Sequence, residues 1–99
     1  MDQIDAQNLL ARLQNGESLN LLDVREEIEY YTYNIGGKNI PLSVFNKNID
    51  QLGYNKTDEI IVICKAGFRS ETAQSILIQN GYQKVKNLTG GLIALQRFQ

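Results

Sequence analysis

The sequence predicts an α/β domain in which parallel strands form one sheet and helices cover both of its faces. Strand-like and helix-like segments alternate along the chain, and the connections between them are short. The apolar run 60–63 is typical of a parallel strand that is buried on both faces. With 99 residues, of which 42% are hydrophobic, the chain has the size of a single domain around one core, over residues 1–99.

The first half of the chain is expected to contain helices and strands in alternation. In order, these are a helix that Asp5 caps and Asn15-Gly16 ends, a strand at 19–25, a helix at 26–33, a strand at 39–42 and a helix at 44–51. Leu9, Leu10 and Leu13 share one face of the first helix. Pro41, the only proline, cannot donate to a neighbouring strand, so it favours a sheet edge or a strand end.

The second half continues the alternation. Its predicted elements are a strand at 60–63 that leads into Cys64, a helix at 70–80, a strand at 84–88, a turn at Gly90-Gly91 and a helix at 92–98. The helix at 70–80 places Ala73, Ile76 and Leu77 on one side, and Gly81 follows its end. Because the strands are linked through helices, we expect them to run parallel.

Composition and charge narrow the classes of function. The net charge of −1 and the absence of a basic cluster argue against nucleic acid as a partner. No stretch approaches the ~20 apolar residues of a membrane-spanning helix, and the first residues lack the pattern of a signal peptide. A single cysteine cannot form an internal disulfide, so we expect a cytoplasmic protein.

The chain contains no histidine. This excludes a Cys-His pair, a Ser-His-Asp triad and a zinc site built on histidine, and we expect no metal. Any activation of a nucleophile must therefore come from backbone dipoles and from cations.

Cys64 follows the buried strand at the sheet edge where open α/β sheets bind their ligands. Gly67 allows a positive φ angle, so successive N–H groups of the loop can turn inward and form an anion-binding nest. Arg69 and Lys65 can add positive charge, and Ser70 can cap the helix that follows. The alternative for a lone cysteine at a strand end is a small buried hydrophobic residue.

The spacing between Cys64 and Arg69 separates two chemistries. Four residues lie between them, whereas cysteine phosphatases of the familiar loop type have one residue more, which lets their loop surround a phosphoryl group. The shorter loop suits one extra sulfur atom better than a phosphate. This argues against a phosphatase or an arsenate reductase, as does the missing acid/base histidine.

Four segments, in this order, resemble the single-domain rhodanese-like proteins. They are 22–26 (LDVRE), 34–42 (NIGGKNIPL), 64–70 (CKAGFRS) and 87–91 (NLTGG). The resemblance covers nearly the whole chain, from about residue 5 to residue 98. It implies a three-layer α/β domain with a small, mainly parallel sheet, and a loop that carries a persulfide on Cys64.

The resemblance also implies a sulfurtransferase that works in two half-reactions, with no cofactor. The Cys64 thiolate takes a sulfane sulfur from a donor, and a thiol, cyanide or protein acceptor then removes it. The implied binding loop consists of Lys65, Ala66, Gly67, Phe68, Arg69 and Ser70, whose amides from Lys65 to Arg69 would hold the persulfide. The partners are a small-molecule or protein donor and acceptor, which the sequence does not name, and it does not fix the oligomeric state.

Two positions depart from the thiosulfate-specific two-domain relatives. Those enzymes carry a basic residue two positions after the cysteine, where this chain has Ala66. They carry an arginine four residues beyond the Asp-x-Arg motif, where this chain has Glu29. A protein or small-molecule persulfide is therefore at least as strong a candidate donor as thiosulfate. A degenerate binding module that does not use its thiol is the alternative function.

Asp23 and Arg25 end a strand that should lie near the Cys64 strand. One hypothesis is that Asp23 accepts hydrogen bonds from the loop backbone or from Arg69 and so fixes the shape of the nest. The other is a local ion pair between Asp23 and Arg25. For Phe68 we expect a side chain that projects outward as a contact surface for a partner, and the alternative is that it packs beneath the loop.

Overall fold

The computed structural model describes all 99 residues. The strands are β1 (Gln3–Ile4), β2 (Leu21–Asp23), β3 (Lys38–Asn39), β4 (Glu59–Ile63) and β5 (Lys84–Leu88). The helices are α1 (Ala6–Gln14), α2 (Glu27–Thr32), α3 (Phe45–Asn48), α4 (Phe68–Gln79) and α5 (Gly91–Gln96), and 3₁₀ turns flank α3 at Leu42–Val44 and Ile49–Gln51.

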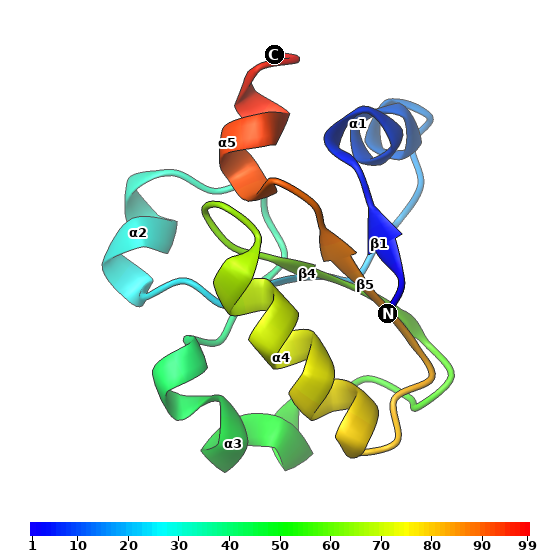
Figure 1. The fold of residues 1–99 in the computed structure, drawn as a ribbon, viewed down its shortest axis with the longest axis vertical. Coiled ribbons are helices and arrows are strands. Elements are labelled where there is room, and N and C mark those ends of the chain that lie inside the picture. The colour runs from blue at the N-terminus through cyan, green and yellow to red at the C-terminus, as the bar shows by residue number, and fades with distance from the viewer.

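The five strands form one sheet in the order β1-β5-β4-β2-β3, and every neighbouring pair is parallel. Helices lie on both sides of the sheet: α1 and α5 on one side, α3 and α4 on the other (Figure 1). The predicted α/β class with covered parallel strands is thus confirmed. Because β4 has a partner on each side, the loop that follows it begins at the centre of the sheet.

Each face of the sheet has its own apolar core, and the alternation of β4 divides its side chains between them. Ile61 and Ile63 pack with Leu9 and Leu95 beneath α1 and α5. The cluster on the other face contains the remaining inward-pointing side chains, namely Leu22, Val24, Phe45, Leu52, Ile60, Val62, Cys64, Ala73, Leu77, Tyr82 and Val85. Since successive side chains of a strand alternate, Cys64 belongs to the face that α4 covers.

Several predicted boundaries differ from the structure. The sequence does not predict strand β1. It has only two residues, and they count as a strand only because they pair with Asn87 and Leu88. Helix α4 begins at Phe68 instead of residue 70, and the expected helix at 44–51 is a short helix between two 3₁₀ turns. The strands predicted at 19–25 and 39–42 are shorter, because the ladder ends where the chain turns away.

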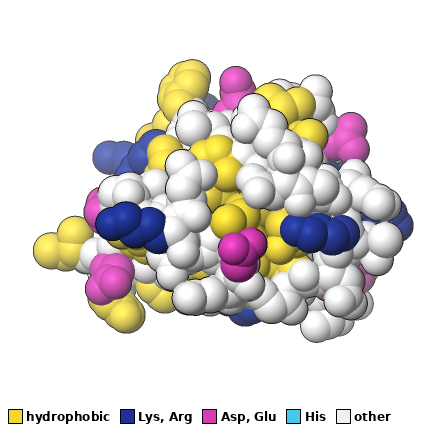
Figure 2. Space-filling model, turned by 90° about the horizontal axis from the view of Figure 1, so that it is seen from below, with side chains coloured by type: hydrophobic (Ala, Val, Ile, Leu, Met, Phe, Trp, Pro, Cys, Tyr) yellow, Lys and Arg dark blue, Asp and Glu magenta, His cyan; other side chains and the backbone are white.

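The side of the molecule on which α3 and α4 lie shows hydrophobic side chains across its middle, with basic groups to either side (Figure 2). None of the helices has both the length and the apolar character needed to cross a bilayer.

Candidate functional site: the Cys64 loop

The loop from Cys64 to Gly67 connects the end of β4 to the start of α4. Cys64 is only 1% exposed, and its Sγ accepts a hydrogen bond from the Gly67 N–H at 3.0 Å. Gly67 adopts φ +99°, which residues with a Cβ rarely reach, and it is the residue that precedes α4. The predicted positive φ at Gly67 is therefore confirmed, and at this residue the chain turns from the loop into α4.

Other N–H groups of the loop are unpaired within the protein. Those of Lys65, Ala66, Phe68 and Arg69 donate to no backbone or side-chain acceptor. Two of them belong to the first turn of α4, where the helix dipole is positive. The loop thus combines a thiol with a set of unsatisfied backbone donors.

Ser70 does not cap α4, because the helix already begins at Phe68 with Gly67 in front of it. It lies instead in the first turn, where its Oγ is 3.2 Å from the Cys64 Sγ. The Ser70 hydroxyl also donates to Oδ1 of Asn87 on β5 at 2.5 Å. Ser70 therefore links the sulfur to the neighbouring strand.

Arg69, which follows the loop in the first turn of α4, is paired with a carboxylate. Arg69 donates from Nη1 and Nη2 to the two carboxylate oxygens of Glu29 on α2, at 2.6 and 2.9 Å. These hydrogen bonds lower the pKa of Glu29 from 4.5 to about 2, and they raise the pKa of Arg69. The expected positive charge of Arg69 is present, but a carboxylate from α2 offsets it.

Asp23 accepts no hydrogen bond from the loop backbone or from Arg69, so the first hypothesis for this residue is wrong. Its carboxylate accepts from the Arg25 backbone N–H and from the Nε and Nη2 of the Arg25 guanidinium. Both side chains are buried, and Arg25 also donates to the carbonyl oxygens of Glu29 and Tyr33 at the end of α2. The local ion pair therefore anchors α2 beside the loop. Asp23 and Arg25 therefore act on the site only indirectly, because α2 carries Glu29, the partner of Arg69.

The N-terminus of α5 packs directly against the Cys64 loop. Its backbone N–H groups at Leu92 and Ile93 donate to the carbonyl oxygens of Cys64 and Lys65, both at 3.0 Å. A Cβ at Gly91 would lie 2.6 Å from the Cys64 carbonyl oxygen. The predicted turn at Gly90-Gly91 thus also provides the close approach that fixes the loop backbone.

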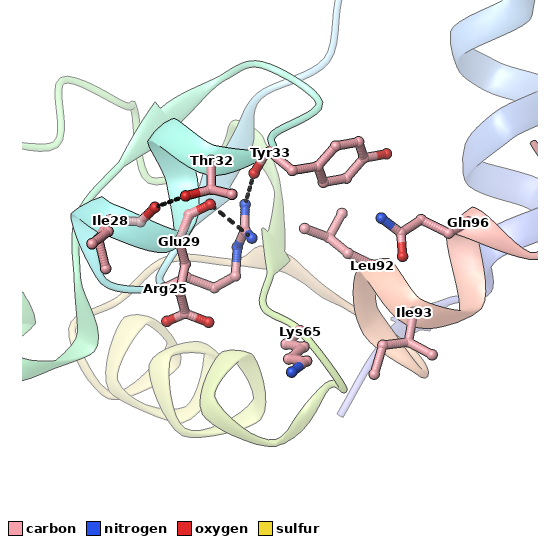
Figure 3. A pocket seen from close by; sticks show the side chains of 9 residues that line it. All are labelled: Arg25, Ile28, Glu29, Thr32, Tyr33, Lys65, Leu92, Ile93 and Gln96. Atoms are coloured by element: carbon pink, nitrogen blue, oxygen red, sulfur yellow. Dashed lines mark hydrogen bonds between the residues drawn. The ribbon is translucent and has the colours of Figure 1, made fainter.

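A pocket of about 320 Å³ opens between α2 and α5, next to the loop (Figure 3). Its lining residues are Arg25, Ile28, Glu29, Thr32, Tyr33, Lys65, Leu92, Ile93 and Gln96. Lys65 reaches this pocket from the loop, whereas the buried Cys64 does not line it. Phe68 projects outward, as expected, and is 79% exposed.

Of the predicted loop residues, the structure places Gly67 and Ser70 in contact with the Cys64 sulfur. Lys65 lines the neighbouring pocket, Phe68 points outward and Arg69 pairs with Glu29, while Asp23 and Arg25 pair with each other beside α2. The roles of Glu29 and Asn87 were missed. Asn87 does give a signal in the sequence. It lies two residues after Val85 on the same strand, so its side chain faces the same core, where a polar residue is unusual. No group of three or more His, Cys, Asp or Glu side chains is placed to hold a metal ion.

Comparison with known proteins adds to this geometry. The sequence profile of the family described as "Rhodanese-like domain" matches residues 5–97. The chain belongs to this family. The resemblance drawn from the four sequence motifs is thereby confirmed.

Two relatives of the chain are named for the handling of sulfur. YrkF of Bacillus subtilis (strain 168), named as a sulfur carrier protein, is 38% identical over 91 residues, which are 91% of this chain and 48% of YrkF. A sulfurtransferase of Allochromatium vinosum is 31% identical over 98% of this chain and 90% of that protein. The chain thus spans about half of YrkF and nearly all of the second relative. Sulfur transfer is supported at the level of the family.

The fold has close counterparts among solved structures. A rhodanese-like domain protein from Staphylococcus aureus superposes with a TM-score of 0.85 over 96% of this chain and 91% of the other, at 27% identity. The five-stranded parallel sheet with its covering helices is therefore the rhodanese-like fold.

Proposed function

We propose that this chain is a rhodanese-type sulfurtransferase that carries a sulfane sulfur as a persulfide on Cys64. The observation on which the proposal rests is the setting of the sulfur. Cys64 accepts the Gly67 N–H, and four further N–H groups between Lys65 and Arg69 have no partner in the protein. Such a set of backbone donors suits a bound anion with its charge on one additional atom.

The transfer proceeds in two displacements. In the first, the Cys64 thiolate attacks the outer sulfur of a donor, a new S–S bond forms, and the donor leaves with the electron pair of the broken bond. In the second, a nucleophilic acceptor such as cyanide or a thiolate attacks the outer sulfur, and the Cys64 thiolate is released. No oxidant or reductant is consumed in either step.

The pocket between α2 and α5 is the proposed place where a donor or acceptor binds. It lies beside Lys65, directly next to the sulfur-bearing residue, and it combines apolar walls with the charged groups of Lys65, Arg25 and Glu29. The exposed Phe68 extends the apolar surface near the loop for a protein partner. Because Cys64 is buried, the loop must open slightly before the donor sulfur can reach it.

The burial of Cys64 favours a second candidate, a rhodanese-like binding module whose thiol is inert. The two candidates differ in one measurable property. Only the sulfurtransferase forms and releases a persulfide.

Intact-protein mass spectrometry after incubation with an organic persulfide or thiosulfate tests the proposal. The expected result is a single adduct of ~32 Da, which cyanide or excess thiol removes. Because the chain has only one cysteine, Cys64→Ser must abolish the adduct completely. A folded wild-type protein that gains no adduct from any donor would exclude the transferase and leave the binding module.

A further inference from the structure

Four buried groups around the sulfur form a closed ring of hydrogen bonds. Gly67 N–H donates to the Cys64 Sγ, which lies 3.2 Å from the Ser70 Oγ. Ser70 in turn contacts Oδ1 of Asn87, and Nδ2 of Asn87 donates back to the Gly67 carbonyl oxygen at 3.1 Å. Cys64, Ser70 and Asn87 are each at least 97% buried, so the ring is shielded from water.

The number of hydrogens in the ring fixes the direction of each bond. A carbonyl oxygen can only accept, so the Asn87 amide must turn its Nδ2 toward Gly67 and its Oδ1 toward Ser70. Oδ1 can also only accept, so the Ser70 hydroxyl donates its single hydrogen to Asn87. The oxygen of Ser70 therefore faces the sulfur as an acceptor, and the S–H group of Cys64 is its donor.

We propose that Asn87 is a positioning residue that holds the resting Cys64 as a thiol by occupying the hydroxyl hydrogen of Ser70. The inference rests on the proposed function, in which Cys64 carries the sulfur. When the thiol proton leaves to solvent, Asn87 and the sulfur anion compete for one hydrogen. The hydroxyl then turns to the sulfur, at the cost of an unpaired Oδ1 on Asn87.

The charged groups around the thiol lie outside the ring. Arg69 on α4 pairs with Glu29 on α2, Asp23 at the end of β2 pairs with Arg25, and Lys65 follows Cys64 in the chain. Substitutions at Asn87 and Ser70 leave all of these charges in place. A change in the acidity of the thiol in such variants therefore reports on the ring alone.

Asn87→Leu is the first test, because it removes both hydrogen bonds of the amide and frees the Ser70 hydroxyl for the sulfur. The readout is the pH profile of Cys64 alkylation by iodoacetamide, whose midpoint reports thiol acidity and whose plateau reports exposure. We expect the midpoint to move to lower pH and alkylation at neutral pH to become about fivefold faster. Gln74→Leu is the matched control: Gln74 is a buried amide on the same sheet face, bonded to the backbone of Val85 and Asp2, and should leave the midpoint unchanged.

The double variant decides whether Asn87 acts through Ser70. In the Ser70→Ala background, the proposal predicts that Asn87→Leu no longer moves the midpoint, because there is no hydroxyl hydrogen to release. The same shift in both backgrounds, or no shift in either, would overturn the proposal. Circular dichroism verifies that each variant is folded.

The S–H stretching band in the infrared spectrum gives a second test that does not require a substitution at Asn87. Since the chain has one cysteine, the band is a single signal. A thiol that donates to Ser70 absorbs at lower frequency than a free one, so Ser70→Ala should move the band to higher frequency. An unmoved band would contradict the assigned bond direction. Neither measurement needs sulfur transfer, so both remain informative if the persulfide experiment fails.

Discussion

The Glu29 carboxylate forms an ion pair with Arg69, which is the only cation in the first turn of α4. Glu29 takes both terminal nitrogens of Arg69, so the positive charge of that guanidinium is largely offset before any substrate arrives. A small dianion such as thiosulfate gains less from Arg69 than it would from an unpaired guanidinium. This contact gives a physical reason for the expectation, drawn from Glu29 and Ala66, that thiosulfate is not favoured over a persulfide as the donor.

Glu29→Gln should therefore make the protein more reactive toward thiosulfate. We expect the second-order rate of Cys64 persulfide formation from thiosulfate to rise about three- to tenfold, and the rise to shrink at high salt. Glu27→Gln is the control, since it removes the same charge from an exposed position of α2 outside the Arg69 pair. Equal rates in the two variants would show that the pairing of Arg69 does not govern thiosulfate reactivity.

Among the elements, α5 has a closer relation to the loop than its place at the end of the chain suggests. Its first N–H groups hold the carbonyl oxygens of Cys64 and Lys65, and Gly91 leaves no room for a side chain against them. The α5 N-terminus thus determines the path of the backbone that carries the sulfur.

Gly91→Ala should disturb the loop itself. The added Cβ would clash with the backbone of Cys64 and Lys65. The alanine would also have to adopt φ +61°, which residues with a side chain rarely do. Gly16→Ala is the matched control, because Gly16 has φ +79° but no atom lies within 4 Å of the place that its Cβ would take. For Gly16→Ala we expect a loss of about 1 kcal/mol, or roughly 4–8 °C in Tm.

For Gly91→Ala the fall in Tm should be clearly larger, and persulfide formation should slow by about tenfold or more, since small displacements of a reacting group are costly. Thermal unfolding and the rate of adduct formation measure the two effects. If both variants behaved alike, the close approach of α5 would have no influence on the site.

The sequence predicts elements best where one physical factor decides them. The apolar run before Cys64 is typical of a buried strand, and Gly67 allows the left-handed turn that the structure shows. The start of α4 is less predictable, because Phe68 and Arg69 occur as readily in a loop as on the exposed side of a helix. The contacts of Asp23, Glu29 and Asn87 depend on which side chains the topology brings together, and no local pattern encodes them.

At the scale of the whole molecule, charge links distant parts of the chain. Glu59 at the start of β4 accepts from Arg12 of α1 and from Lys86 of β5. Hydrogen bonds from Arg12, above all, lower the pKa of Glu59 from 4.5 to about 2. Together with Glu29, this makes two carboxylates that bind protons more weakly in the folded chain than in the unfolded one.

The free energy of unfolding should therefore decrease as the pH falls from about 4.5 toward 2. In this range the unfolded chain takes up protons that the folded chain resists, so acid favours unfolding, and the contribution is fully present above 4.5. Urea titrations at several pH values measure the slope. Glu59→Gln should make the slope shallower, whereas Glu27→Gln should not; the same slope in wild type and Glu59→Gln would contradict the assignment.

The order of the strands in the sheet also determines which strands lose their hydrogen bonds first on heating. The outermost strands, β1 and β3, have two residues each, while β4 is flanked on both sides and carries the segment with the thiol. Fraying begins at margins with few hydrogen bonds and moves inward. The central strand that leads into Cys64 is thus expected to be among the last parts of the chain to lose its structure.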